Sequence, residues 1–236
     1  MKVFVVHAHP EPKSFNGAMT RTAVSTLSAA GHDVKVSDLY QMNWQPISDR
    51  RNFKTIKDDD FYKQQLEELH ASENEGFADD IRLEHEKLDW CDLLIFQFPL
   101  WWFGLPAILK GWVDRVFVMG KIYGGGVWYD EGYFKGKRAL CSVTVGGPAS
   151  SYGVSGINGD IDQILFPINH GILYFVGFDV VRPFIVHGPA RMSESERRKK
   201  LNDYVSFLLR ADSFEIIKYK KLADYGTTFV ADQKHE

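Results

Sequence analysis

The sequence predicts an α/β fold in which helices cover both faces of a parallel β-sheet. Short apolar or β-branched runs alternate along the chain with segments of helical periodicity. The runs are almost continuously apolar, as expected for parallel strands that are buried on both faces. With 236 residues, of which 44% are hydrophobic and 25% charged, the chain suits one large globular domain, although two small domains are also possible.

The predicted elements follow one another in a regular order. A strand at 2–8 precedes a helix at 15–30, which Gly31 ends. The later strands are expected at 34–37, 92–98, 139–145 and 179–186, the last weakened by Pro183, and the later helices at 105–118, 160–171 (with Pro167 inside) and 193–210. Ser193 and Glu196 have the spacing of a capping box at the start of the last helix.

Five parallel strands fit the flavodoxin-like order 2-1-3-4-5 about as well as a truncated dinucleotide-binding fold. The glycine pattern of a Rossmann nucleotide loop is absent after the first strand, which favours the flavodoxin-like arrangement. We therefore assign residues 1–210 to one flavodoxin-like domain, with a polar insertion at about 39–75, and residues 211–236 to a C-terminal tail. The sequence gives no role for the insertion or the tail.

Charge and composition exclude several classes of function. A net charge of −3 and a pI near 6.2 provide no basic surface for nucleic acid or an anionic membrane. No apolar run approaches the roughly 20 residues that span a bilayer, and the first residues do not resemble a signal peptide. We therefore expect a soluble cytoplasmic protein without a transmembrane segment.

The sequence offers no metal site or disulfide. We expect no metal ion to be held by His7 and His9 together. Cys91 and Cys141 lie in or beside apolar runs and lack the paired spacing of zinc ligands. We expect both cysteines to be buried free thiols.

The most informative segment spans residues 96–117, where an apolar strand leads through a turn into a helix. Its turn consists of Leu100, Trp101, Trp102 and Phe103, whereas turns usually carry Gly, Asn, Asp or Ser. Such a turn indicates a flat apolar ligand, or else a loop buried against the same chain. The segment alone does not decide between the two.

Two further loops follow strands at the same predicted sheet edge, where ligands bind in this class of sheet. Residues 9–16 open a helix whose N-terminus attracts phosphate, with Ser14 and Asn16 as added donors, although ordinary capping by Ser14 explains the pattern equally well. Gly146 and Gly147 let the backbone approach a ligand, and Tyr152 could donate a hydrogen bond to it; a flexible loop is the alternative. Together the three loops favour a nucleotide with a flat ring, and a flavin satisfies all of them.

Residues 96–117, 14–16, 37–43 and 144–147 resemble the NAD(P)H:quinone oxidoreductases, the family of DT-diaphorase and its ribosyldihydronicotinamide-dependent relative. The resemblance extends from residue 2 to about residue 210. It implies a flavodoxin-like fold, a homodimer with the site at its interface, and FAD as the cofactor, with FMN less expected. It also implies a cycle of alternating half-reactions in which hydride passes from a nicotinamide donor to a quinone acceptor.

The resemblance also implies roles for individual residues. Flavin-binding positions are His9, Phe15, Asn16, Leu100, Trp101, Trp102, Phe103, Asp114, Thr144, Val145, Gly146, Gly147, Tyr152 and Arg197, with Asp114 and Arg197 at the AMP half of FAD. Tyr152 and Asn158 match catalytic positions. Trp102 and Phe103 line the substrate pocket together with Tyr123, which lies on a loop that the family's partner subunit lends.

Two departures from DT-diaphorase concern the substrates. Asn158 stands where DT-diaphorase has a histidine, and asparagine can hydrogen-bond but cannot titrate, so a proton relay through this position is excluded. The ribosyldihydronicotinamide-dependent relative also has asparagine there, which leaves the preferred donor open. Residues 124–126 are all glycine where DT-diaphorase has a tyrosine at 125, which opens the substrate wall.

Three other functions remain compatible with the sequence. The aromatic turn could serve a protein partner, as in a flavin-bound regulatory subunit of a membrane transporter of the potassium efflux type. A one-electron carrier of the flavodoxin type is another reading. An azo or nitro reductase is a third, because the same reduced flavin serves those acceptors.

Overall fold

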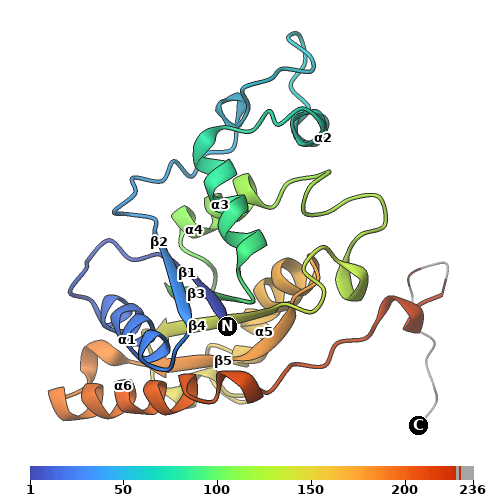
Figure 1. Ribbon diagram of the computed structural model, residues 1–236. Coiled ribbons are helices and arrows are strands. Elements are labelled where there is room, and N and C mark those ends of the chain that lie inside the picture. The colour runs from blue at the N-terminus through green and yellow to red at the C-terminus, as the bar shows by residue number, and fades with distance from the viewer. Residues whose placement is uncertain (227–228, 230–236) are drawn as a thin grey trace.

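The fold is a five-stranded parallel sheet in the order β2-β1-β3-β4-β5, which confirms the predicted fold class and strand order (Figure 1). It is seen in a computed structural model that describes residues 1–226 and 229. The strands are β1 (Lys2–His7), β2 (Asp33–Asp38), β3 (Leu93–Pro99), β4 (Arg138–Val145) and β5 (Asp179–His187). The predicted tail at 211–236 lies partly outside the described residues, and the predicted domain boundaries stay a prediction.

Helices cover both faces of the sheet (Figure 1). They are α1 (Phe15–Ala29), α2 (Gln64–Glu73), α3 (Asp79–Trp90), α4 (Ala107–Val116), α5 (Ile161–Ile168) and α6 (Glu194–Leu208). Side chains of β1 alternate between two cores: Val3 and Val5 pack with α1 and α6, whereas Phe4 and Val6 pack with α3, α4 and α5. β1 is therefore covered on both sides.

Two helices were missed by the sequence analysis, and both have a polar buried face. α2 lies inside the segment that was read as an irregular insertion, and it buries Glu67 and Glu68. α3 buries Glu84 and His85 beside its apolar residues. Because hydrophobic periodicity is the main signal for a helix, carboxylates on the buried face concealed both. The helix predicted at 160–171 also differs: α5 ends at Ile168 and continues as a π-helical turn, η4 (Asn169–Tyr174).

The buried carboxylate of Glu84 joins three elements of the core. It is fully buried and accepts hydrogen bonds from Ser37 Oγ on β2 (2.8 Å) and from Trp112 Nε1 on α4 (2.9 Å). Lys87 Nζ, on the same helix, lies 2.6 Å from it. A buried charge is tolerated only when it is paired and hydrogen-bonded, and Glu84 has both kinds of partner.

The insertion packs tightly on α4 through Arg115, which is 3% exposed. Its guanidinium donates to Asn52 Oδ1 (2.8 Å), pairs with Asp80 (2.8 Å) and lies over the ring of Trp44 at 4.5 Å. A guanidinium suits this place because its several N–H donors lie in one plane that can also stack on an aromatic ring.

The first part of the tail lies along β5, which is the edge strand of the sheet. Arg182 N–H donates to Glu215 O (2.9 Å) and Ile217 N–H donates to Val180 O (2.8 Å), in an antiparallel contact. Pro183 directly follows Arg182, at a register shift between β4 and β5. Proline is tolerated on an edge strand or at a bulge. Pro183 meets both conditions, because β5 is an edge strand and its register shifts at this point.

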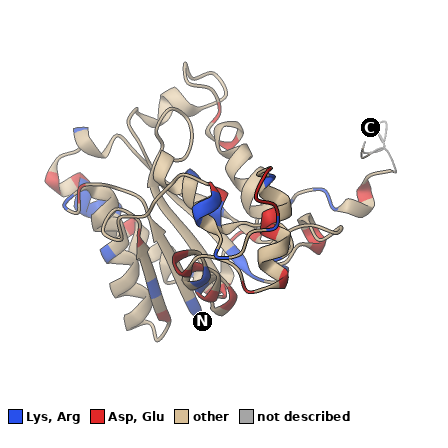
Figure 2. Cartoon of the chain, turned by 90° about the horizontal axis from the view of Figure 1, so that it is seen from above, with Lys and Arg blue, Asp and Glu red and all other residues tan. Residues whose placement is uncertain are grey.

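Other sequence predictions can be compared with the described part of the chain. Cys91 and Cys141 are buried free thiols, as expected, and burial raises the pKa of Cys91 to about 12. Basic and acidic residues are interspersed over the elements (Figure 2), consistent with the small net charge. Among the described residues, no helix is long and apolar enough to cross a bilayer, and no cluster of His, Cys, Asp and Glu could hold a metal ion.

Candidate active site

A cleft of about 510 Å³ opens at the carboxyl edge of the sheet, within the size range of small-molecule sites. Its lining residues are His9, Lys13, Ser14, Phe15, Asn16, Pro99, Leu100, Trp101, Thr144, Val145, Gly146, Pro189, Ala190 and Arg197. The three loops predicted from sequence all contribute to it. The sequence analysis did not predict Lys13 or the segment after β5 that contains Pro189 and Ala190. Because ligands bind at the carboxyl ends of strands in such sheets, the segment after β5 could have been predicted.

The first loop supplies the start of α1. Ser14 Oγ accepts a hydrogen bond from Gly17 N–H (3.0 Å), so the capping role considered from sequence is present. Ser14 also lines the cleft, so capping and ligand binding do not exclude each other. Lys13 and Arg197 add two cations, and the described residues that line the cleft include no Asp or Glu. A helix N-terminus with two cations suits a phosphate group.

A buried chain of amides ties the three loops together beneath the cleft. Gln97 Nε2 donates to Asn16 Oδ1 (2.9 Å), and Asn16 Nδ2 donates to Thr144 Oγ1 (2.8 Å). All three side chains are buried, and Gln97 Oε1 has no hydrogen-bond partner among the described residues. Gln97 was not predicted as a site residue, although a glutamine within an otherwise apolar strand is a signal that could have identified it.

The second loop holds its aromatic residues in a strained backbone. Trp101 and Gly104 exchange backbone hydrogen bonds (3.2 and 3.0 Å), and between them Trp102 and Phe103 have φ angles of 51° and 58°. Left-handed backbone costs about 1–3 kcal/mol in a bulky residue and clusters at functional sites. Trp102 is 97% exposed, which argues against a loop buried in its own chain. Trp102 and Phe103 do not line the cleft itself.

The third loop brings the two predicted catalytic residues together beside the cleft. A Cβ atom on Gly147 would lie 3.0 Å from the Tyr152 ring and 3.7 Å from Asn158 Nδ2, so a side chain at 147 would displace Tyr152. The His187 ring is 5.8 Å from that of Tyr152, and burial lowers the pKa of His187, which favours neutral imidazole. Gly146 faces open space and allows close approach of a ligand to its backbone.

Two predicted site residues lie away from the cleft of their own chain. Asp114 is exposed on α4 and pairs with Lys110 (2.5 Å). Tyr123 packs against Phe175, with 5.9 Å between ring centroids. Neither residue lines this cleft.

Tyr123 belongs to a group of aromatic side chains that we call the aromatic wall, made of Tyr123, Trp128, Tyr129 and Phe175. Phe175 is its centre: Trp128 stacks on it at 6.5 Å and 22°, and Tyr129 meets it edge-on at 5.4 Å. Stacked and edge-on rings are the favoured geometries of aromatic pairs, so the wall is a packed unit.

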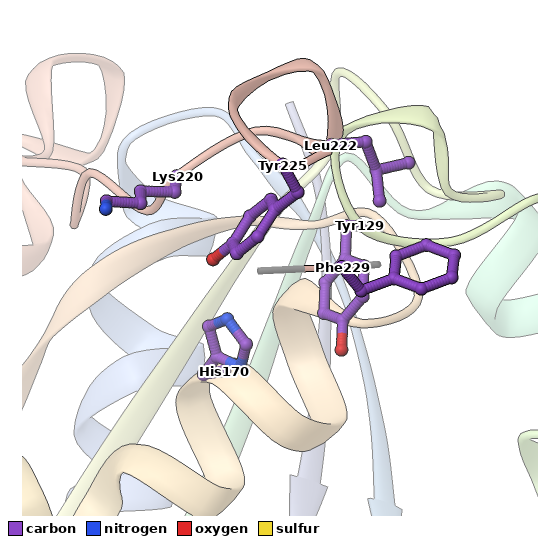
Figure 3. Close-up of a pocket in the computed structure, with 6 residues that line it drawn as sticks. All are labelled: Tyr129, His170, Lys220, Leu222, Tyr225 and Phe229. Carbon is purple, nitrogen blue, oxygen red and sulfur yellow. The ribbon is translucent and has the colours of Figure 1, made fainter. Parts of the chain in front are cut away.

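The second part of the tail closes on the aromatic wall. Tyr174 OH donates to Lys220 O (3.0 Å), and Leu222 N–H donates to Asp130 Oδ1 (2.8 Å). A cavity of about 230 Å³ lies between tail and wall, with the Tyr225 hydroxyl directed toward His170 (Figure 3). Its lining residues are Tyr129, His170, Lys220, Leu222, Tyr225 and Phe229. The tail therefore packs on the structure that carries the wall.

The sheet order and the cleft define a protein of the flavodoxin-like class. Residues 1–208 match the family model described as flavodoxin-like fold. Ribosyldihydronicotinamide dehydrogenase (quinone) of Homo sapiens is 46% identical over 198 residues, which cover 84% of this chain and 86% of that protein. NAD(P)H dehydrogenase (quinone) 1 of Cavia porcellus is 44% identical over 188 residues, which cover 79% of this chain and 68% of that protein.

Solved structures agree with these relatives. A structure from Klebsiella pneumoniae superposes with a TM-score of 0.95 at 40% identity, covering 98% of this chain and 93% of that one. The NAD(P)H:quinone oxidoreductase of Methanothermobacter marburgensis superposes with a TM-score of 0.72 at 26% identity, covering 92% of this chain and 99% of that one. The chain thus belongs to the flavodoxin-like family of the NAD(P)H and ribosyldihydronicotinamide dehydrogenases (quinone), which confirms the resemblance seen in the sequence.

Proposed function

We propose that this protein is a flavin-dependent enzyme that reduces quinones by two electrons, with a reduced nicotinamide as the donor. The observation that carries the proposal is the cleft at the carboxyl edge of the sheet. It combines a helix N-terminus and two cations, Lys13 and Arg197, with the apolar surfaces of Leu100 and Trp101. A nucleotide that joins phosphates to a flat ring requires this combination.

The residues present fit a flavin. The Gly146 backbone is open to close approach, and the cleft lining contains cations but, among the described residues, no carboxylate. When bound, the flavin supplies the ability to take hydride from a nicotinamide and pass it to a quinone. We propose FAD rather than FMN, because Arg197 lies at the cleft and matches the family position at the AMP half.

The chain's own residues position the reactants and stabilise charge. In our proposal the N–H groups of Gly146 and Gly147 and the hydroxyl of Tyr152 donate hydrogen bonds where negative charge develops on the ring system. Asn158, close to Gly147, can add a hydrogen bond but cannot relay a proton. Below the ring, the buried amides of Gln97 and Asn16 keep the loops in place.

We further propose a homodimer in which each copy completes the site of the other. Trp102 is almost fully exposed although its backbone is strained, and Asp114 and Tyr123 do not line the cleft of their own chain. A second copy that placed its aromatic wall over Trp102 and Phe103 would cover these side chains and supply Tyr123. The cytoplasmic location stays a prediction.

The other readings are less well supported. Curated relatives with 44–46% identity are dehydrogenases (quinone), which favours an enzyme over a regulatory subunit or a one-electron carrier. Azo and nitro compounds are not favoured as natural acceptors by these relatives.

The proposed function is tested on the purified protein. We expect released FAD and quinone-dependent oxidation of NADH, NADPH or a truncated nicotinamide such as ribosyldihydronicotinamide. Comparison of the three donors identifies the preferred one. The absence of flavin, or the oxidation of no donor in the presence of a quinone, would contradict the proposal, and copurification with a protein partner without turnover would favour the regulatory subunit.

Replacing Arg197 with alanine is expected to weaken FAD binding by about 10–100-fold, since a hydrogen bond to a charged group contributes about 1.5–3 kcal/mol. FMN lacks the AMP half, so its affinity should change little. Arg198→Ala is the matched control, because Arg198 is exposed on the same helix and pairs with Glu194 at 2.8 Å. Titration of apoprotein with both flavins measures the effect; equal losses for FAD and FMN would place Arg197 elsewhere on the cofactor.

A further inference from the structure

Glu68, on α2 within the insertion, is a buried carboxylate with an unusual set of partners. It is 2% exposed, and no cation of the described chain forms an ion pair with it. Burial raises the pKa of Glu68, because charge is unfavourable away from water. A buried carboxylate without a cation is costly, and its hydrogen-bond partners show what it holds.

One partner of Glu68 lies on the turn that precedes Tyr123. Met119 N–H donates to Oε2 (2.8 Å), while Gln64 Nε2, on the same helix, donates to Oε1 (2.8 Å). Met119 in turn forms an isolated β-bridge with Tyr123. The carboxylate therefore holds the backbone of the turn that ends at Tyr123.

The turn itself has little freedom to move against α2. Ser72 Oγ donates to Met119 O (3.1 Å), and a Cβ atom on Gly120 would lie 2.8 Å from Leu69 Cδ1. Gly120 N–H then donates to Tyr123 O (2.8 Å), which closes the turn. The carboxylate of Glu68 lies at the centre of this contact.

Beyond Tyr123 the chain has fewer contacts. Gly124, Gly125 and Gly126 have φ angles of 120°, 62° and 91°, and a Cβ atom on Gly125 or Gly126 would meet nothing within 4 Å. Tyr123 is therefore held by the turn that Glu68 fixes and by the packing of its ring on Phe175. Through this turn, Glu68 helps to set where Tyr123 presents its ring in the aromatic wall.

We propose that Glu68 is a positioning residue for the acceptor: it orients Tyr123 so that the tyrosine ring forms one side of the quinone pocket in a second copy of the chain. This gives the insertion a role, since α2 carries Glu68. The inference rests on the proposed function, because it requires a quinone pocket that Tyr123 completes.

Glu68→Gln tests the proposal with little change in shape. An amide has one acceptor oxygen where the carboxylate has two, so one donor loses its partner. We expect the KM for quinone to rise about tenfold or more, as for a lost hydrogen bond to a charged group. Flavin content and the rate of the donor half-reaction should be unchanged. Glu67→Gln is the matched control. Glu67 is equally buried, but it accepts a hydrogen bond from Lys57 N–H (2.8 Å), away from the turn. This substitution should lower the stability of the protein and leave the KM for quinone unchanged.

A double-mutant cycle decides whether Glu68 acts through Tyr123. Tyr123→Ala removes the ring, so Glu68→Gln should raise the KM for quinone little further in that background. Additive effects, or an unchanged KM in Glu68→Gln, would overturn the positioning role. Ser72→Ala, which removes the hydrogen bond to Met119 O on the same turn, keeps the test valid if Glu68→Gln does not fold.

Tyr123→Ala separates this inference from the proposed function. If it leaves the KM for quinone unchanged, Tyr123 does not complete the quinone pocket, and both the shared site and the role of Glu68 are wrong. If it raises KM while Glu68→Gln and Ser72→Ala have no effect, the shared site stands and only the positioning role is wrong. A wild-type protein that reduces no quinone overturns the proposed function itself.

Discussion

Replacing Tyr152 with phenylalanine is expected to slow the bleaching of the bound flavin by NAD(P)H by about 10²–10³-fold, the usual cost of losing one donor to a developing negative charge. Phenylalanine keeps the ring that packs beside Gly147, so the loop should retain its shape and the spectrum of the bound flavin should be nearly unchanged. Only the hydroxyl is lost. Stopped-flow absorbance in a single turnover measures the donor half-reaction directly.

Tyr133→Phe provides the control for this experiment. Tyr133 is also a partly exposed tyrosine, but its hydroxyl donates to Asp89 (3.0 Å) and it does not line the cleft. Its loss should leave the bleaching rate unchanged. If Tyr152→Phe also leaves the rate unchanged, Tyr152 has no part in the chemistry and charge stabilisation has to come from the backbone of Gly146 and Gly147.

Glu84→Ala is expected to lower the free energy of unfolding by about 3–5 kcal/mol, as when one partner of a buried ion pair is removed. The substitution leaves the ammonium of Lys87 and the indole N–H of Trp112 without their common acceptor. It also leaves Ser37 Oγ without that partner. Urea unfolding followed by tryptophan fluorescence measures the change.

Glu86→Ala, on the same helix, is the matched control for Glu84. Glu86 is exposed and pairs with Arg82, so its loss should change stability by no more than about 0.5 kcal/mol. A loss below about 1 kcal/mol in Glu84→Ala would show that the core relaxes around the missing carboxylate or that water enters and replaces it.

The sheet and most of the cleft were predictable because apolar strands and their loops follow local rules. Alternation of strands and helices fixed the class, and the bulky turn of Trp101 together with the glycines at 146 and 147 indicated where a ligand lies. α2 and α3 were not predictable in this way, since their buried faces carry Glu67, Glu68, Glu84 and His85. A carboxylate on a buried face is recognisable only once its distant partners are known.

The individual site residues also differ in whether local sequence could predict them. His9, Asn16 and Arg197 were assigned by resemblance, and the structure places all three at the cleft. Tyr123 and Asp114 do not line it. In our proposal their contacts belong to an assembly of two chains, which the sequence of one chain does not describe. Gln97 escaped notice because its role depends on Asn16 and Thr144, which are far from it in sequence.

The placement of the aromatic wall has a consequence for how this family diversifies. The flavin cleft is built on the strand ends of the sheet, whereas the wall is held by α2 in the insertion and by the tail at Lys220 and Leu222. Insertions and tails vary readily in length and sequence, while strand ends inside a packed sheet do not. If the wall faces the acceptor, as we propose, evolution can exchange one acceptor for another at the periphery and leave the inherited cofactor chemistry intact.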